Sequence, residues 1–274
     1  MRINRCSPWK IYNMVLCCAM LSGTFCSVGA AAENASVNER ARAVFESSKH
    51  TVVSIQLVLK TRYSFGSDTQ EQENNQELSG TVISPDGLTV VALSATDPTG
   101  LMRTLSGELD DGDVATEISD VKIMLQDASE IEAQVVLRDN DLDLAFIMPT
   151  ERPAEPLPYV SLENSGKPEI FDQVVAINRL GQVANRVYSG ALETIEAVVE
   201  RPRTYYIPGS SPTHTGLGCP VFTLDGDFVG ILVVRAIRRT STARSSGSSM
   251  IAIIVPADEI AYVAEQVPGF DDPE

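Results

Sequence analysis

The chain has 274 residues and a formal net charge of −16 at pH 7, with 37 acidic residues against 21 basic ones. So acidic a balance argues against nucleic acid and anionic membrane surfaces as partners, because both would repel the chain. The length allows one large or two small hydrophobic cores.

The first 32 residues have the features of a secretory signal peptide. Three basic side chains precede a short apolar stretch, from Met14 to about Leu21, and small residues follow at 27–32. That stretch is shorter than the roughly 20 apolar residues that span a bilayer, so we expect no stable membrane span after signal removal. An uncleaved membrane anchor is the alternative. Residues 33–274 are therefore expected to be exported, to the periplasm or the extracellular space.

Cysteine content limits how residues 33–274 can be stabilised. Four of the five cysteines lie in the predicted signal, and only Cys219 remains. An intrachain disulfide is therefore impossible, although export would permit one. We expect the fold to depend on an ordinary hydrophobic core.

After a predicted amphipathic helix at 35–49, the sequence is typical of β-structure. Short apolar or alternating runs rich in Val, Ile and Thr occur at 51–60, 80–84, 88–93, 121–125, 131–138, 144–148, 173–178, 187–195, 221–224, 228–234 and 250–255. The runs Pro85-Asp86-Gly87 and Asp225-Gly226 predict tight hairpin turns, because glycine accepts the positive φ that such turns need. A helix is predicted at 257–267. So many strands with so little helix between them favour an antiparallel sandwich or barrel.

A proline-rich stretch at 150–158 divides these strands into two sets. We therefore expect two small barrels, one over about 50–150 and the other over about 159–256. Polar, charged or Ser-rich stretches at 68–78, 108–120 and 238–249 are predicted to be solvated or mobile loops.

Three stretches in the same order resemble the trypsin-like serine proteases of the HtrA/Deg group. They are SGTVISPDGL at 79–88, DNDLDLA at 139–145 and GLGCPVF at 216–222. The resemblance extends over about 44–267 and implies an all-β, chymotrypsin-like fold. It would consist of two antiparallel barrels of the six-stranded type, with an N-terminal and a C-terminal helix. No PDZ domain is expected within the chain.

The same resemblance assigns the catalytic positions. Hydrolysis on this fold needs a hydroxyl nucleophile, an imidazole base, an orienting carboxylate and backbone donors for the oxyanion. Asp143 stands at the carboxylate position, but the histidine position falls on Ser94 and the nucleophile position on Leu217. Thr215 replaces the first glycine of the oxyanion hole. The chain is therefore expected to be a catalytically inactive pseudoprotease.

A protein of this kind would bind a polypeptide or an envelope protein partner without cleaving it. The cleft between the barrels, or the mobile loops predicted at 204–215 and 238–249, would provide the surface. Ser211, which aligns with the floor of the primary specificity pocket, His214 and Cys219 are the candidate binding residues. A domain with no ligand at all is a further possibility that the sequence leaves open, as is the oligomeric state.

The competing hypothesis is an endopeptidase with a rearranged site, using Cys219 as nucleophile and His214 as base. It requires the thiol within about 3 Å of the imidazole, whereas a free cysteine in such a segment is more often a small buried hydrophobe. The acidic run at 110–113 lacks the full pattern of a calcium loop. We expect no metal and no cofactor.

Overall fold

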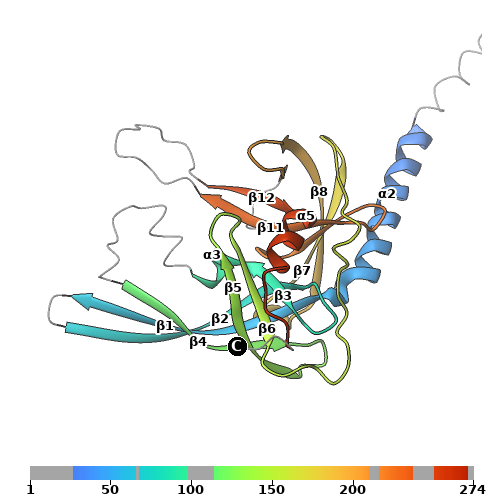
Figure 1. Cartoon of the computed structure of the whole chain (residues 1–274). Coiled ribbons are helices and arrows are strands. Elements are labelled where there is room, and N and C mark those ends of the chain that lie inside the picture. Colours follow the sequence, from blue (N-terminus) through green and yellow to red (C-terminus); the bar gives the residue numbers. More distant parts are fainter. Residues whose placement is uncertain (1–26, 66–67, 98–113, 210–215, 237–249, 271–274) are drawn as a thin grey trace, which may run out of the picture.

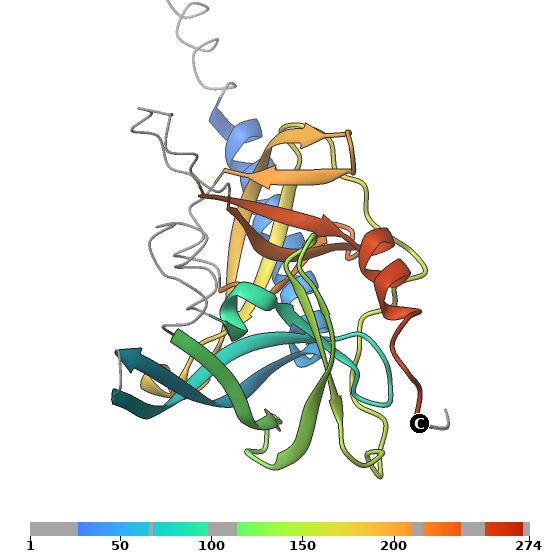
Figure 2. The same ribbon diagram turned by 60° about the vertical axis from the view of Figure 1, so that its left-hand side comes forward.

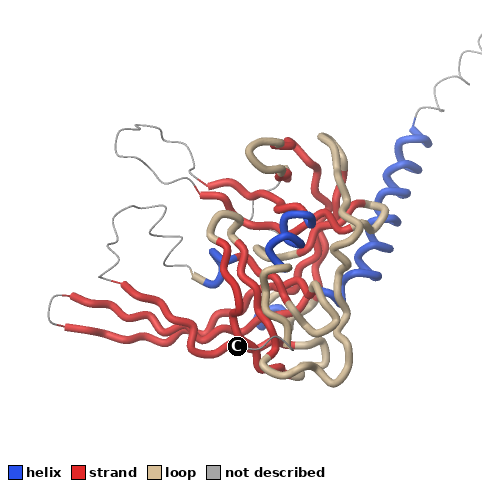
Figure 3. The backbone as a smooth tube through the Cα atoms, in the orientation of Figure 1, coloured by secondary structure: helices blue, strands red, loops and turns tan. Residues whose placement is uncertain are grey.

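The computed structural model describes residues 27–65, 68–97, 114–209, 216–236 and 250–270, without the side chains of 27–35, 64, 65, 68, 114, 115 and 236. Strands are the predominant regular structure in this part of the chain (Figure 3). Two closed antiparallel barrels of six strands each follow one another along the sequence. The predicted all-β, chymotrypsin-like fold is thus confirmed.

The first barrel has the strand order β1-β2-β3-β6-β5-β4. Its strands are β1 (Val52–Phe65), β2 (Asp68–Val82), β3 (Thr89–Ala92), β4 (Val114–Met124), β5 (Glu130–Asp139) and β6 (Leu144–Pro149). The short helix α3 (Leu93–Thr96) directly follows β3. The last residue of β3 pairs with the first residue of β6, Ala92 with Leu144, so the end of one strand adjoins the start of the other.

The second barrel has the order β10-β11-β12-β9-β8-β7. Its strands are β7 (Gln173–Arg179), β8 (Tyr188–Val199), β9 (Tyr205–Pro208), β10 (Pro220–Thr223), β11 (Phe228–Ala236) and β12 (Met250–Pro256). Two 3₁₀ turns, η1 (Lys49–Thr51) and η2 (Gln182–Ala184), precede β1 and β8 respectively. Gly87 and Gly226 have positive φ, at 89° and 95°, as the predicted hairpin turns require.

Three hydrophobic cores result, one inside each barrel and one between them. The alternation of side chains along a strand explains how they are separated. Val91 of β3 faces the interior of barrel one, while Val90 and Ala92 face the core between the barrels. On β11, Leu232 faces the interior of barrel two, and Val233 faces the shared core. Because these strands are buried on both faces, their sequences are continuous apolar runs.

The N-terminal helix α2 (Ser27–Ser48) runs along the outside of barrel two, and its first turns extend beyond the barrel (Figures 1 and 2). The helix begins at Ser27, eight residues before the predicted start at residue 35, and its first residues therefore lie within the predicted signal segment. Val44 and Phe45 pack it against the shared core. Within the described residues, no helix is long and apolar enough to cross a membrane. At the other end, α5 (Ala257–Ala264) buries Ile260 and Val263 and ends three residues before the predicted boundary.

The prediction of a loop at 68–78 is wrong. These residues form most of β2 and pair with β1 throughout, from Ile55 opposite Leu78 to Phe65 opposite Asp68. With β4 they form a three-stranded arm that projects from barrel one (Figure 1). Side chains at 69–75 are exposed, so they stay solvated as predicted. The segment is a strand because its backbone pairs with β1, and the acidic side chains from which the loop was predicted carry no information about that pairing.

Two other loop predictions are wrong in part. Residues 114–120, within the predicted loop at 108–120, belong to β4 and pair with β1. In the predicted mobile loop at 204–215, residues 205–208 form β9, which pairs with β8 and with β12. Residues 108–113 and 210–215 of these loops, and the whole of the segment 238–249, lie outside the described residues.

Polar side chains tie the two barrels together away from the cores. The Ser79 hydroxyl donates to the side-chain carbonyl of Asn178 and to the Arg179 carbonyl, the latter at 3.0 Å. In return the Arg179 guanidinium donates to the carbonyls of Met124, at 2.7 Å, and Leu125, at 2.9 Å. These bonds link β2 and the end of β4 in barrel one to β7 in barrel two.

A second tie lies beside the first. Arg186 and Glu77 form an ion pair with an N–O distance of 2.6 Å, and their side chains are only 22% and 18% exposed. The other Glu77 oxygen accepts the Gln182 backbone N–H at 3.0 Å. The orientation of the barrels is therefore set by directional bonds as well as by packing.

Candidate functional site

Asp143 lies at the junction of the barrels, in the loop immediately before β6. Its φ is +58°, a left-handed conformation that aspartate tolerates better than most residues but that still carries strain. The Asp143 carbonyl accepts the Leu93 N–H at 2.9 Å, which extends the pairing of β6 with β3 by one step. This conformation turns the carboxylate toward the first turn of α3.

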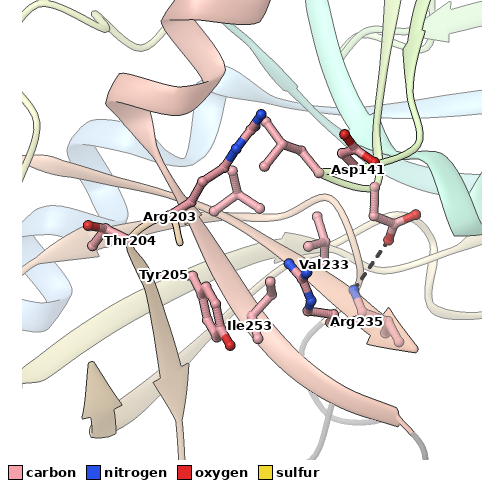
Figure 4. Close-up of a pocket in the computed structure, with 11 residues that line it drawn as sticks. Asp141, Arg203, Thr204, Tyr205, Val233, Arg235 and Ile253 are labelled. Carbon is pink, nitrogen blue, oxygen red and sulfur yellow. Dashed lines mark hydrogen bonds between the residues drawn. The ribbon is translucent and has the colours of Figure 1, made fainter. Parts of the chain in front are cut away.

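Three donors converge on that carboxylate. Oδ1 accepts the backbone N–H of Ser94 at 2.7 Å, and Oδ2 accepts the Ser94 hydroxyl at 2.8 Å. From barrel two, the backbone N–H of Val234 donates to Oδ2 at 3.3 Å (Figure 4). The structure thus brings together Ser94 and Asp143, two of the three predicted triad positions, and adds a donor from the other barrel.

Burial decides the protonation of this group. Removal from water raises the pKa of Asp143 to about 6, although the hydrogen bonds from Ser94 and Val234 act in the opposite direction. The carboxyl therefore titrates near neutrality. An aspartate with its ordinary pKa near 4 would stay ionised throughout the physiological range.

The segment with the predicted nucleophile position packs against barrel one. Leu217 is half-buried and contacts the core between the barrels, where it presents only an apolar side chain. Next to it, Gly218 has a φ of +84° and lies so close to β2 and β3 that a Cβ would stand 2.6 Å from the Ser79 carbonyl oxygen and 3.1 Å from the Ala92 nitrogen. The Gly218 carbonyl accepts the Thr81 hydroxyl at 3.0 Å. Leu217 is thereby held near the strand that leads into Ser94.

Cys219 does not face the junction. It is fully buried inside barrel two, and that burial raises the pKa of its thiol to about 12. A buried thiol that stays protonated can neither contact a bound polypeptide nor attack a carbonyl. We therefore remove Cys219 from the candidate binding residues, and the hypothesis of a Cys219–His214 pair loses its nucleophile.

A small cavity of about 20 Å³, room for about one water molecule, lies on the barrel-two side of Asp143. Asp141 lines it from the same loop, and Arg203, Tyr205 and Arg235 line it from barrel two (Figure 4). The Arg235 guanidinium lies over the Tyr205 ring, 5.6 Å from its centre. Charges of both signs therefore surround this side of the carboxylate.

Several predicted site residues lie outside the described part of the chain. These are Thr215 at the oxyanion position and the binding candidates Ser211 and His214. Sequence reasoning also missed Val234. Only the backbone N–H of Val234 contacts Asp143, so its side chain gives no signal in the sequence. Identifying this contact requires knowing that β11 lies beside the loop that carries Asp143. Within the described residues, no cluster of three or more metal-ligating side chains occurs.

The two closed barrels, with a carboxylate at their junction and a tight glycine turn packed against β2 and β3, define the class of trypsin-like, chymotrypsin-fold proteins. A family model described as the trypsin-like peptidase domain matches residues 78–231, more than half of the chain. The chain belongs to this family.

A relative among curated proteins is named as a protease of the HtrA/Deg group. It is a Rickettsia conorii (strain ATCC VR-613 / Malish 7) protein named "Probable periplasmic serine endoprotease DegP-like", 27% identical over 124 residues. The match covers 43% of this chain and 24% of that relative, so the chain spans about a quarter of the relative's length. The resemblance to the HtrA/Deg group is thus confirmed at the level of the fold.

Proposed function

We propose that this protein is a trypsin-like peptidase homologue that has lost peptide-bond hydrolysis and binds an extended polypeptide outside the cytoplasm. One observation carries the proposal: the Asp143 carboxylate, which would orient a histidine, is hydrogen-bonded by Ser94 through both its N–H and its hydroxyl. A serine hydroxyl cannot serve as the base in this position, because it does not accept a proton near neutral pH.

The other half of the site supports the same conclusion. Leu217 offers neither a hydroxyl nor a thiol, and the neighbouring thiol of Cys219 is buried and protonated. Loss of the nucleophile or of its base alone costs about 10⁶ in turnover in a related triad. The orienting carboxylate cannot compensate, since it acts only through an imidazole.

Among the described residues, the last part of the β11 edge has no strand partner on the β10 side, and this supports the proposed binding role. β10 pairs with β11 only as far as Ile231. At the next residue of β11, the Leu232 N–H donates to the Cys219 carbonyl at 3.0 Å, and the Leu232 carbonyl accepts the Gly218 N–H at 2.7 Å. Backbone groups of alternate residues face the same edge, so those of Val234 and Ala236 face the junction between the barrels. An extended polypeptide could add there as a further strand without any chemistry.

The proposed location depends on the N-terminal sequence. A basic start, a short apolar stretch and small residues before about position 32 are typical of a signal peptide. The relative's printed name places that protein in the periplasm. Intact-mass measurement of the protein from the exported fraction should give a chain shortened by about 32 residues; a full-length mass in that fraction would contradict cleavage.

Hydrolysis is tested with the purified full chain, a fluorogenic casein substrate and a fluorophosphonate probe for activated serine. We expect no turnover above buffer and no labelling, with trypsin as the positive control. Turnover that disappears in Cys219→Ala, or labelling of any serine, would overturn the proposal.

Binding is tested with a rhodamine-labelled, capped peptide of about nine alternating Val and Thr residues, by fluorescence anisotropy. Ala236→Pro removes one N–H of the proposed edge, so it should weaken binding by about 3- to 10-fold, the net value of one hydrogen bond. Asp86→Asn, in the exposed β2–β3 hairpin, is the matched control and should bind as the wild type does. Equal affinity of wild type and Ala236→Pro would exclude this edge.

A further inference from the structure

The backbone N–H of Val234 is the first donor of the β11 edge beyond the residues already bonded to barrel two. In the structure this donor is not available, because it is directed at Asp143 Oδ2 at 3.3 Å. A strand added to β11 opposite Val234 would need the same N–H for one of its carbonyls. The Asp143 carboxylate and a bound polypeptide therefore compete for one donor.

We propose that Asp143 is a proton-controlled gate on this edge: the ionised carboxylate holds the Val234 N–H, and the protonated carboxyl releases it to a carbonyl of the incoming strand. The inference rests on the proposed binding function and names its regulation. It predicts tighter binding of extended polypeptides in acidic surroundings.

The geometry selects which bond protonation weakens. Oδ1 is held by the Ser94 N–H, a fixed donor at 2.7 Å. Oδ2 meets a hydroxyl, which can rotate and accept a hydrogen bond as well as donate one. A proton on Oδ2 can therefore be donated to the Ser94 oxygen. The Val234 N–H then faces a neutral oxygen, a weaker acceptor than a carboxylate, across the longest of the three contacts.

The surroundings of Asp143 allow its carboxyl to change protonation state between mildly acidic and neutral pH. Burial raises the pKa of this carboxyl to about 6, the largest influence upon it. The charged groups that line the adjoining cavity are Asp141 on the same loop and Arg203 and Arg235 from barrel two, and none of them is among the causes of this shift. From α3, only the uncharged Ser94 faces the carboxyl.

Both arginines already have other partners. Arg203 pairs with Glu259 of α5 at 3.6 Å, and the Arg235 guanidinium stacks on Tyr205. Neither donates a hydrogen bond to the Asp143 carboxylate among the bonds of the described residues. Desolvation is therefore not cancelled by an ion pair, and the carboxyl can take up a proton without breaking one.

The test measures the affinity of the full chain for the capped Val/Thr peptide at pH 5 and pH 7.5, at constant ionic strength. The peptide has no titratable side chain. We expect binding about 3- to 10-fold tighter at pH 5, as one additional hydrogen bond allows. Equal or weaker binding at pH 5 overturns the gate and leaves the proposed function intact. Absence of binding at both pH values overturns both.

Three variants connect the pH effect to this carboxyl. Asp143→Asn should bind with an affinity that does not change between the two pH values, while Asp86→Asn should keep the wild-type ratio. Ser94→Ala removes a bond that lowers the pKa of Asp143, so the midpoint of the binding curve should move to higher pH. An unmoved midpoint in Ser94→Ala would contradict the gate even if Asp143→Asn failed to fold.

Discussion

The two halves of the candidate site stabilise their side chains in different ways. Barrel one keeps the carboxylate of Asp143, and Ser94 satisfies it by hydrogen bonds. Barrel two presents Leu217 to the shared core and encloses Cys219. A buried carboxylate without donors would be costly, so it needs hydrogen-bond partners such as Ser94, whereas an apolar side chain at the predicted nucleophile position is stabilised by packing alone.

The largest expected effect concerns the reactivity of Cys219. With its pKa raised to about 12, we expect alkylation by iodoacetamide at pH 8 to be about 10³-fold slower than for an exposed cysteine. Peptide mapping by mass spectrometry distinguishes this thiol from the four in the N-terminal segment. Labelling of Cys219 in the native protein as fast as after unfolding in urea would show that barrel two exposes it.

Gly218→Ala should destabilise the protein by about 3 kcal/mol or more. The new Cβ would collide with the Ser79 carbonyl, in a backbone conformation that already disfavours a side chain. Gly226→Ala is the matched control, since its φ is also positive but a Cβ there meets nothing within 4 Å. It should cost only about 1 kcal/mol. Urea denaturation measures both, and equal losses would contradict the close contact between the barrels.

The Asp143 carboxyl should make stability depend on pH. Its pKa in the folded state, about 6, lies above the 3.8 of an unperturbed aspartate. The folded state therefore favours the proton, and the resulting stability is fully present below about pH 4 and lost as pH rises through 6. The shift corresponds to about 3 kcal/mol. Comparison of urea midpoints between pH 4 and 8 should show this decline in the wild type and not in Asp143→Asn.

The smallest expected effect concerns the ion pair between Glu77 and Arg186, which links the two barrels. Glu77→Ala leaves the half-buried Arg186 without its partner, so we expect a loss of about 2 kcal/mol. Glu73→Ala breaks the exposed pair with Lys60, with side chains 63% and 50% exposed, and should cost less than about 1 kcal/mol. If both cost the same in urea denaturation, the pair between the barrels would be no stronger than a surface one.

The sequence predicts the barrels well where strands are buried. Apolar runs such as those of β3, β6 and β11 leave few alternatives to a strand in a core, and the glycine turns locate their ends. In contrast, β2 along the arm is exposed and acidic, so only its backbone pairing with β1 makes it a strand. The same reason explains why the first half of β4 was predicted as a loop.

For the candidate site, the resemblance to a known family indicates which positions should lie close together, but not which hydrogen bonds join them. Ser94 and Asp143 are 49 residues apart, and their hydrogen bonds depend on the pairing of β3 with β6. The Val234 contact joins two barrels through a main-chain group. Such a contact depends on tertiary placement, which local propensity does not contain.

The bonds of Arg179 have a consequence for how the molecule comes apart. Its guanidinium holds the Met124 and Leu125 carbonyls at the end of β4, while its own main chain belongs to barrel two. Opening either barrel would leave these groups without partners in a desolvated place. The barrels should therefore melt as a single cooperative unit, with one calorimetric transition, despite being separate closed sheets.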